Sequence, residues 1–123
     1  MNELIQAAKD IITLRYQKGK HSVGAAVKAS SGKIYTGVSM NSQKLNICSE
    51  WVAMGKALTA GETDFKISVA IHRSQDGEFD IYPPCALCRE LYLTYCPNIK
   101  VIIPGNEQVR AIDLLPNAWI KTR

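Results

Sequence analysis

The sequence predicts an α/β fold in which helices cover both faces of a mixed β-sheet. Helical and strand patterns alternate along the chain, in the order helix, hairpin, helix, strand, helix, strand. One of these helices, over residues 48–60, is apolar almost all round, which is typical of a buried helix. The 123 residues, 46% hydrophobic and 21% charged, fit one domain with a single core, spanning residues 1–123.

The first third of the chain predicts a helix followed by a β-hairpin. Apolar residues recur every three or four positions over residues 2–18, which indicates an amphipathic helix that ends at Gly19. Residues 22–29 and 33–38 have strand character, and Ser31-Gly32 between them is a turn signal. Residues 41–46 are polar and predict a loop.

The remaining elements alternate buried helices with inner strands. Residues 48–60 predict a helix closed by Gly61, and residues 66–72 predict a central strand because they are rich in β-branched side chains. Residues 85–96 predict a second buried helix, with Leu87, Leu91 and Tyr95 at four-residue spacing and Pro97 as its stop. A strand over 99–103 and a short helical turn over 113–116 complete the order.

Composition points to a small-molecule substrate and a cytoplasmic location. The net charge of +4 is modest and the basic residues are scattered, so no dedicated nucleic-acid surface is indicated. No apolar run approaches the roughly 18–20 residues of a membrane span, and the first residues lack an export pattern. In a reducing compartment, four cysteines favour metal binding or catalysis over disulfides.

Two motifs carry the chemistry, Cys48-Ser49-Glu50 and Pro84-Cys85-Ala86-Leu87-Cys88, and each is placed where a predicted helix begins. Cys85 and Cys88 are three residues apart, so both sulfurs project to one side of a helical turn. A thiolate from Cys48 would complete three corners of a tetrahedral zinc site and leave the fourth open, as in catalytic zinc enzymes. The positive ends of the two helices would offset the excess thiolate charge.

Glu50 is the candidate proton carrier. It stands in a segment that otherwise has only Lys56 as a charged residue, and an unpaired buried carboxylate is costly unless it has a task. Beside zinc, this carboxylate would take a proton from a water and deliver protons to a ring nitrogen and a leaving amine.

Other interpretations of the cysteines remain open from the residues alone. A structural zinc site would need a fourth protein ligand, for which the candidates are Cys96, His21 and His72. We expect Cys96 to pack in the core and His72 to be a structural histidine. A redox pair of Cys85 and Cys88 would leave Glu50 unexplained.

The motifs resemble the signature of the zinc-dependent nucleoside and base deaminases, Cys-x-Glu followed by Pro-Cys-x-x-Cys. Similarity to the small cytidine deaminases extends over nearly the whole chain. It includes Val23-Gly24-Ala25-Ala26, residues 32–37, Cys88-Arg89 and Asp113-Leu114-Leu115-Pro116. A short segment between Gly37 and Cys48, and Trp119 after the terminal motif, resemble the blasticidin-S deaminase branch.

The resemblance implies a three-layer α-β-α sandwich with a mixed five-stranded sheet. It further implies one Zn²⁺ per subunit, a homotetramer with active sites near subunit contacts, and hydrolysis of an exocyclic amine to a carbonyl with release of ammonia. It assigns Cys48, Cys85 and Cys88 as ligands and Glu50 as the proton shuttle. The backbone of Ser49 and the carbonyl of Pro83 are expected to meet the substrate ring.

Departures from the cytidine deaminase pattern put the substrate in question. Ser39 and Asn41 stand where an Asn and a Glu hold the ribose, and the usual aromatic before Val23 is replaced by His21-Ser22. Trp119, from the same or a neighbouring subunit, is a candidate for the lost apolar contact. An arginine that often follows the catalytic glutamate is Trp51 here, so Arg89 is a candidate for retaining zinc, with a plain surface role as the alternative.

The sequence therefore predicts a deaminase of a cytosine-type nucleoside. Cytidine or deoxycytidine, a blasticidin S-like compound, and an unrelated aminated heterocycle are all compatible with the residues. A catalytically silent, zinc-stabilised binding protein of the same fold is the alternative, and nucleic-acid editing is disfavoured by the absence of a basic strip.

Overall fold

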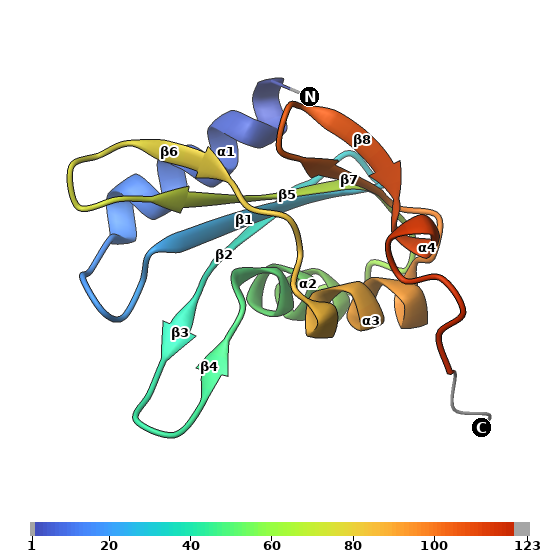
Figure 1. Cartoon of the computed structure of the whole chain (residues 1–123). Helices are drawn as coiled ribbons and strands as arrows, with labels where there is room; N and C mark the ends of the chain where they lie inside the picture. Colours follow the sequence, from blue (N-terminus) through green and yellow to red (C-terminus); the bar gives the residue numbers. More distant parts are fainter. Residues whose placement is uncertain (1, 120–123) are drawn as a thin grey trace.

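The computed structural model describes residues 2–119 and has three layers. Helix α1 (Asn2–Arg15) lies on one face of a β-sheet, and helices α2 (Ser49–Thr59) and α3 (Ala86–Tyr95) lie on the other (Figure 1). A fourth helix, α4 (Ala111–Leu114), is a single short turn near the C-terminal end of the described chain. The predicted α-β-α sandwich is confirmed.

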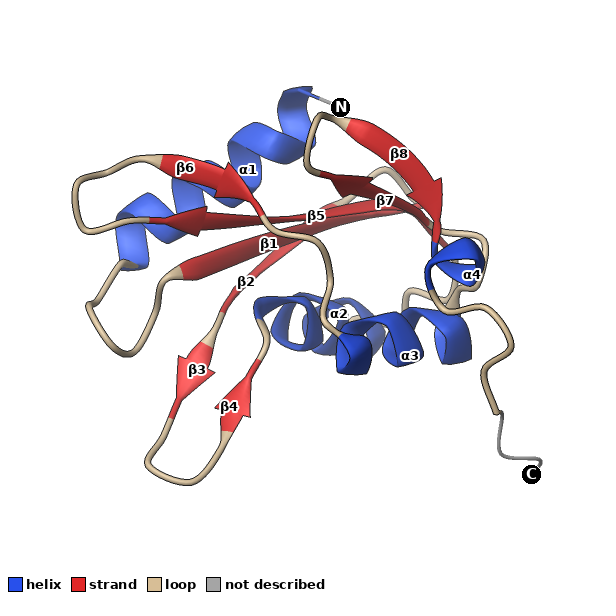
Figure 2. Ribbon diagram, viewed as in Figure 1, coloured by secondary structure: helices blue, strands red, loops and turns tan. Residues whose placement is uncertain are grey.

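The central sheet has five strands in a continuous order and a sixth at one side (Figure 2). The order is β2 (Ile34–Val38), β1 (Val23–Ala29), β5 (Phe65–Arg73), β7 (Lys100–Ile103) and β8 (Glu107–Arg110). The short strand β6 (Phe79–Ile81) also pairs with β5. Among the strands of residues 2–119, β5 and β7 form the one parallel pair of this sheet, so the sheet is mixed, and β5 is central as its residues predicted.

The two faces of the sheet enclose separate apolar clusters. Leu4, Ala8 and Ile12 of α1 recur every four residues and are buried, and Leu4 and Ala8 pack against residues of β1 and β5. On the other face, residues of α2 and α3 pack against β1, β5 and β7. This second cluster supports the helix starts that carry the cysteine motifs.

Gly37 sets how closely α2 approaches the sheet. A β carbon built on Gly37 would lie 2.5 Å from the backbone nitrogen of Ala53 and 2.9 Å from the carbonyl oxygen of Ser49. These distances are far below van der Waals contact, so only glycine allows the helix to sit this near strand β2. The position of Ser49, the first residue of α2, therefore depends on a glycine in the neighbouring strand.

Four features differ from the sequence-based expectations, three of them within residues 40–95. Residues 41–46 are not wholly loop, because β3 (Met40–Asn41) and β4 (Asn46–Ile47) form a small hairpin. Helix α2 is not buried all round, since Trp51 is 39% exposed. In α3 the buried face holds Cys88, Leu91 and Tyr92, whereas Leu87 and Tyr95 are 64% and 52% exposed.

The first helix also ends earlier than expected, at Arg15 and not near Lys18. Gly19 then adopts a positive φ of 78°, a conformation that suits glycine at a turn. In the described part of the chain, no helix is long and apolar enough to cross a membrane.

Candidate metal centre and active-site pocket

Three cysteine sulfurs from two helix starts converge on one point. The ligand atoms of Cys48, Cys85 and Cys88 all lie within 4.8 Å of one another. The Sγ atoms of Cys48 and Cys85 are 3.3 Å apart, and those of Cys85 and Cys88 are 3.5 Å apart. All three are free thiols, so this arrangement is a set of soft donors placed to bind one zinc ion.

Each motif occupies the N-terminal end of a helix, as predicted. Cys48 and Cys85 are the residues that immediately precede α2 and α3, and both have extended backbones. Neither helix start has a side-chain capping hydrogen bond, so no capping side chain competes with the sulfurs for the first-turn N–H groups. The N–H groups of Leu87 and Cys88 are near enough to the Cys85 sulfur to lower the pKa of its thiol.

The thiols differ in acidity because their surroundings differ. Burial, together with the hydrogen bond to Cys85, raises the pKa of Cys48 to about 11. Burial and the negative charge of Glu50 raise the pKa of Cys88. Burial also acts to raise the pKa of Cys85, but the N–H of Cys88 and the neighbouring thiols outweigh it and lower that pKa. A cation is needed before all three thiols carry charge together.

Glu50 lies beside the sulfurs and is buried, with 6% of its surface exposed. Burial raises the pKa of its carboxyl group, although hydrogen bonds from its own backbone and from the Ser49 and Cys88 side chains oppose the shift. The Ser49 hydroxyl donates to Glu50 Oε1 at 3.1 Å. A raised pKa makes the carboxylate a stronger base, which favours its use as a proton acceptor.

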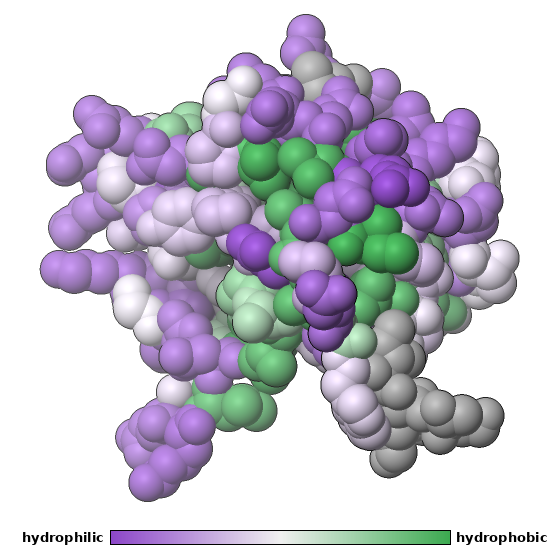
Figure 3. Space-filling model, turned by 45° about the vertical axis from the view of Figure 1, so that its right-hand side comes forward, coloured by the Kyte–Doolittle hydropathy of each residue, from purple (hydrophilic) through white to green (hydrophobic). Residues whose placement is uncertain are grey.

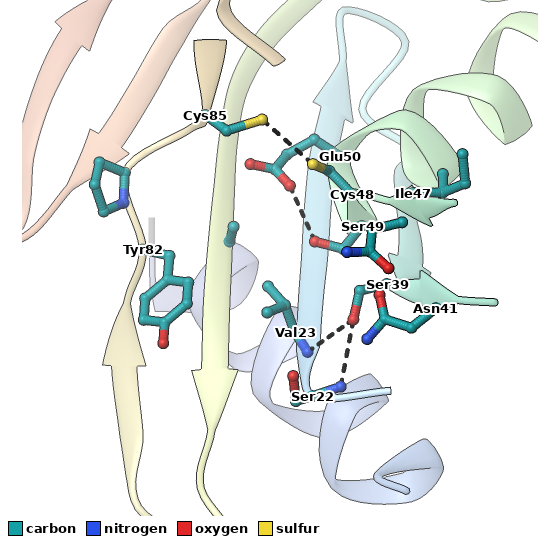
Figure 4. A pocket seen from close by; sticks show the side chains of 13 residues that line it. Ser22, Val23, Ser39, Asn41, Ile47, Cys48, Ser49, Glu50, Tyr82 and Cys85 are labelled. Atoms are coloured by element: carbon teal, nitrogen blue, oxygen red, sulfur yellow. Dashed lines mark hydrogen bonds between the residues drawn. The ribbon is translucent and has the colours of Figure 1, made fainter. Parts of the chain in front are cut away.

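A pocket of about 200 Å³ opens onto this group. Cys48, Cys85 and Glu50 line it, whereas Cys88 does not, so an ion held by the three sulfurs would face the pocket on its free side (Figure 4). The pocket therefore gives a substrate access to both the metal position and the carboxylate.

Four of the predicted substrate-binding residues line this pocket, namely Ser39, Asn41, Ser49 and Pro83. Ser39 is buried, and its Oγ accepts backbone N–H bonds from Ser22 at 3.3 Å and Val23 at 3.2 Å. Trp119 is 82% exposed and is not among the residues that line the pocket of its own chain. Its contact with substrate stays a prediction.

Sequence reasoning missed several residues of the pocket wall. Ser22, Val23, Asn46, Ile47, Ala70 and Tyr82 also line it. Tyr82 is the most informative of them, because it stands directly before Pro83 and so enters the pocket next to the cysteine motif. The sequence signal that could have identified Tyr82 was its position two residues before the Pro84-Cys85 motif.

The alternative ligands lie elsewhere. Within residues 2–119, neither Cys96 nor a histidine joins the group of three sulfurs. Cys96 is 8% exposed within the apolar cluster of α3, as expected of a packing residue. His21 Nδ1 is 2.7 Å from the Ser39 carbonyl oxygen, and the ring of His72 stacks on Tyr82.

Arg89 contacts backbone carbonyl groups next to the metal motif. Its Nε donates to the Pro84 oxygen at 2.9 Å and its Nη1 to the Leu114 oxygen at 2.9 Å. It is half-buried and therefore not a plain surface residue. Its connection to the cysteines runs through the backbone that precedes Cys85.

Comparison with known proteins agrees with this geometry. The family described as "Cytidine and deoxycytidylate deaminase zinc-binding region" matches residues 1–103. A blasticidin-S deaminase of Bacillus cereus is 34% identical over 110 residues, which are 85% of this chain and 79% of that protein. A cytidine deaminase of Sporosarcina psychrophila is 29% identical over 109 residues, 83% of this chain and 77% of that protein.

A solved structure shows the same fold and shares part of the sequence. The crystal structure of the cytidine deaminase from Burkholderia pseudomallei superimposes with a TM-score of 0.81 and 27% identity, covering 96% of this chain and 98% of that one. The family match spans most of the chain, and the three cysteines are placed to bind one metal ion. The chain thus belongs to the cytidine and deoxycytidylate deaminase family and is a zinc-dependent hydrolytic deaminase.

Proposed function

We propose that this enzyme deaminates a cytosine-type nucleoside, either cytidine or deoxycytidine or a blasticidin S-like compound. The exocyclic amine of the ring is replaced by a carbonyl, and ammonia is released. The observation that carries this proposal is the convergence of three sulfurs on one point beside a buried carboxylate, at the wall of a pocket. The names of the two relatives, a blasticidin-S deaminase and a cytidine deaminase, support this substrate class.

Cys48, Cys85 and Cys88 hold the zinc ion. When bound, zinc would supply Lewis-acid activation of water. Glu50 would accept a proton from water and deliver protons to a ring nitrogen and the departing amine. Its burial favours this role, because a carboxylate with a raised pKa is a stronger base and accepts a proton more readily than an exposed one. The Ser49 hydroxyl at 3.1 Å orients the carboxylate.

The ring is held by groups at the two motifs. Ser49 and Pro83 line the pocket, which supports contacts of the Ser49 backbone and the Pro83 carbonyl with the ring edge. Ser39 and Asn41 line the far part of the pocket and contact the substituent on the ring. Trp119 is 82% exposed and so is available to a neighbouring subunit.

The enzyme acts as a homotetramer in the cytoplasm. Its reduced thiols suit a reducing compartment. Several large apolar side chains are exposed on the isolated chain, which suits burial between subunits; they include Leu45, Trp51, Leu87, Tyr95 and Trp119. Figure 3 shows hydrophobic side chains gathered at the centre of one face, with hydrophilic residues around them. Native mass spectrometry gives the subunit number directly.

An ammonia-release assay of zinc-loaded protein tests the proposed activity. Cytidine, deoxycytidine, cytosine and blasticidin S are the substrates, and Glu50→Gln and Glu78→Gln are the variants. Glu50→Gln should keep stoichiometric zinc and lose ammonia release by at least about a thousandfold, because the proton carrier is absent. Glu78→Gln removes a carboxylate from an exposed turn and should retain activity. Zinc-loaded protein that releases no ammonia from any of these compounds would instead support a silent binding protein.

A further inference from the structure

Tyr82 and His72 form a stacked aromatic pair at the wall of the pocket. Their ring centroids are 4.7 Å apart and their planes differ by 1°. Tyr82 lines the pocket and is 42% exposed, and its backbone N–H donates to the Ala70 carbonyl of β5 at 2.9 Å. Both the backbone and the ring of Tyr82 are therefore fixed against β5, and the ring is still accessible to a ligand.

The strand register places this pair away from the metal position. In the pairing of β1 with β5, His72 lies opposite Val23. The N–H of Val23 donates to Ser39 Oγ, so His72, Val23 and Ser39 stand at one level of the pocket. Figure 4 shows Tyr82 across the pocket from Ser22 and Ser39, with Cys48, Cys85 and Glu50 at the other end. A ring that reacts beside Glu50 would direct its substituent towards Tyr82.

The far end of the pocket, where Ser22, Ser39 and Asn41 lie, offers a substrate neutral hydroxyl and amide groups. Among the described residues that line the pocket, Glu50 is the only carboxylate, and it lies at the metal end. Ser39 Oγ already accepts two backbone N–H bonds, so its hydroxyl is left mainly as a donor. Tyr82 adds a hydroxyl that both donates and accepts, and an aromatic ring that can pack on the C–H groups of a sugar.

We propose that Tyr82 is a specificity-determining residue that contacts the substituent of the substrate and not the ring that reacts. His72 is a positioning residue that holds the plane of the Tyr82 ring. The Nδ1 atom of His72 is buried and has no hydrogen-bond partner in residues 2–119, so no such bond at that atom competes with the stacking. This inference rests on the proposed nucleoside deamination.

Binding without turnover separates the substituent from the reacting ring. Calorimetry on the zinc-loaded Glu50→Gln protein measures the affinity for cytidine, blasticidin S and the free base cytosine. Adding Tyr82→Ala should weaken binding of the nucleoside that the protein prefers by roughly tenfold, which is typical of one lost aromatic contact and one hydrogen bond. Cytosine has no substituent, so its affinity should change less than about twofold.

Three further variants divide the effect between ring, hydroxyl and support. Tyr82→Phe should keep the part of the affinity that comes from the ring. His72→Ala should lose affinity for the nucleoside, and His72→Phe should restore it because a flat ring again supports Tyr82. Phe79→Ala is the matched control, since it removes an exposed aromatic side chain of β6 that does not line the pocket.

The outcomes distinguish this inference from the function on which it rests. Equal losses for cytosine and nucleoside, or no loss with Tyr82→Ala, overturn the specificity role while leaving deamination intact. Failure of the zinc-loaded parent protein to bind any of the three compounds overturns the proposed function and this inference with it. Unchanged binding in His72→Ala overturns the positioning role alone.

Discussion

Arg89 is joined to the residue that precedes a metal ligand, because its Nε donates to the carbonyl oxygen of Pro84 at 2.9 Å. Its Nη1 donates at the same distance to the carbonyl oxygen of Leu114, in α4. One guanidinium group thus ties the backbone before Cys85 to the C-terminal part of the described chain. A rigid guanidinium suits this role, because it presents several N–H groups in fixed directions.

Removing this tie should accelerate the loss of zinc. We expect Arg89→Ala to release zinc roughly 10-fold faster, in line with the effect of residues that orient metal ligands. The rate of zinc release from Arg89→Lys should lie between those of the parent protein and Arg89→Ala, because an ammonium group on a flexible stem holds two carbonyl groups less well than a guanidinium group. The rate is measured with a chromophoric chelator, and the absorption spectrum of the cobalt-loaded protein reports the geometry of the sulfurs.

Arg110→Ala is the control for this experiment. It removes an arginine from the same part of the chain, where Arg110 pairs with Asp113 at 3.2 Å and both side chains are about half exposed. An exposed pair of this kind contributes little, and it does not touch the backbone near Cys85. Equal rates of zinc loss in the Arg89 and Arg110 variants would mean that the tie has no influence on the metal.

The metal site was predictable because its signal is local. Cys48-Ser49-Glu50 and the segment from Pro84 to Cys88 each fit the start of a helix, and helix starts are visible in the sequence. The N-terminal ends of α2 and α3 face each other because both helices pack on the same face of the sheet. A resemblance to known deaminases supplied this step, which periodicity alone does not.

The pocket position of Tyr82 and the exposed faces of α2 and α3 were not predictable, because they depend on contacts between segments that are distant in the sequence. Tyr82 becomes a pocket residue only because β6 folds back on β5 and brings it against His72, ten residues earlier in the chain. In α3 the periodic residues Leu87, Leu91 and Tyr95 indicate a helix, but which stripe faces the sheet depends on packing. The two-residue strands β3 and β4 are too short to carry an alternation pattern.

Gly37 should be intolerant of a side chain. Its β carbon would lie 2.5 Å from the Ala53 nitrogen and 2.9 Å from the Ser49 carbonyl oxygen. Both of these atoms belong to the backbone of α2, so the helix would have to move. We expect Gly37→Ala to lower the free energy of unfolding by about 2–4 kcal/mol, as overpacking at a rigid contact does. Because Ser49 moves with α2, zinc should also be lost faster. Urea unfolding and zinc content are the measurements.

Gly55→Ala is the matched change within α2 itself. A β carbon there meets no atom within 4 Å, and alanine favours a helix over glycine by about 1 kcal/mol. This variant should therefore be as stable as the parent or more stable. A Gly37→Ala protein as stable as the parent would show that α2 does not depend on the close approach.

Substitution of Cys88 and substitution of Cys96 should have different effects on zinc binding. Both are buried in α3 or at its end, but only Cys88 is within the group of three sulfurs. Cys88→Ala should lose stoichiometric zinc, because two sulfurs do not complete the site. Cys96→Ala should retain one zinc per chain and lose about 1 kcal/mol of stability, because it removes only a packed sulfur.

Atomic emission on dialysed protein gives the zinc content of each variant, and urea unfolding gives the stability. A Cys96→Ala protein that loses its metal would make Cys96 a ligand and the site structural. A Cys88→Ala protein with full zinc would remove Cys88 from the coordination set.

Glu62 should confer a pH dependence on stability that is separate from the active site. Its Oε2 accepts hydrogen bonds from the hydroxyl groups of Ser31 and Tyr35, each at 2.8 Å, and these bonds lower the pKa of the carboxyl group. The same bond to Glu62 raises the pKa of Tyr35. Since the carboxylate is favoured in the folded chain, its contribution is present above the ordinary carboxyl pKa and is lost as the pH falls through the lowered value.

Urea unfolding between pH 3 and pH 7 measures this contribution in the parent protein and in Glu62→Gln. The variant should lose less stability on acidification than the parent, because its amide does not titrate. At the alkaline end, Tyr35→Phe should reduce the loss of stability as the pH rises from the ordinary tyrosine pKa through the raised value, because phenylalanine does not titrate. Parallel acid profiles for the parent and Glu62→Gln would mean that the bonds from Ser31 and Tyr35 do not favour the carboxylate in the folded chain.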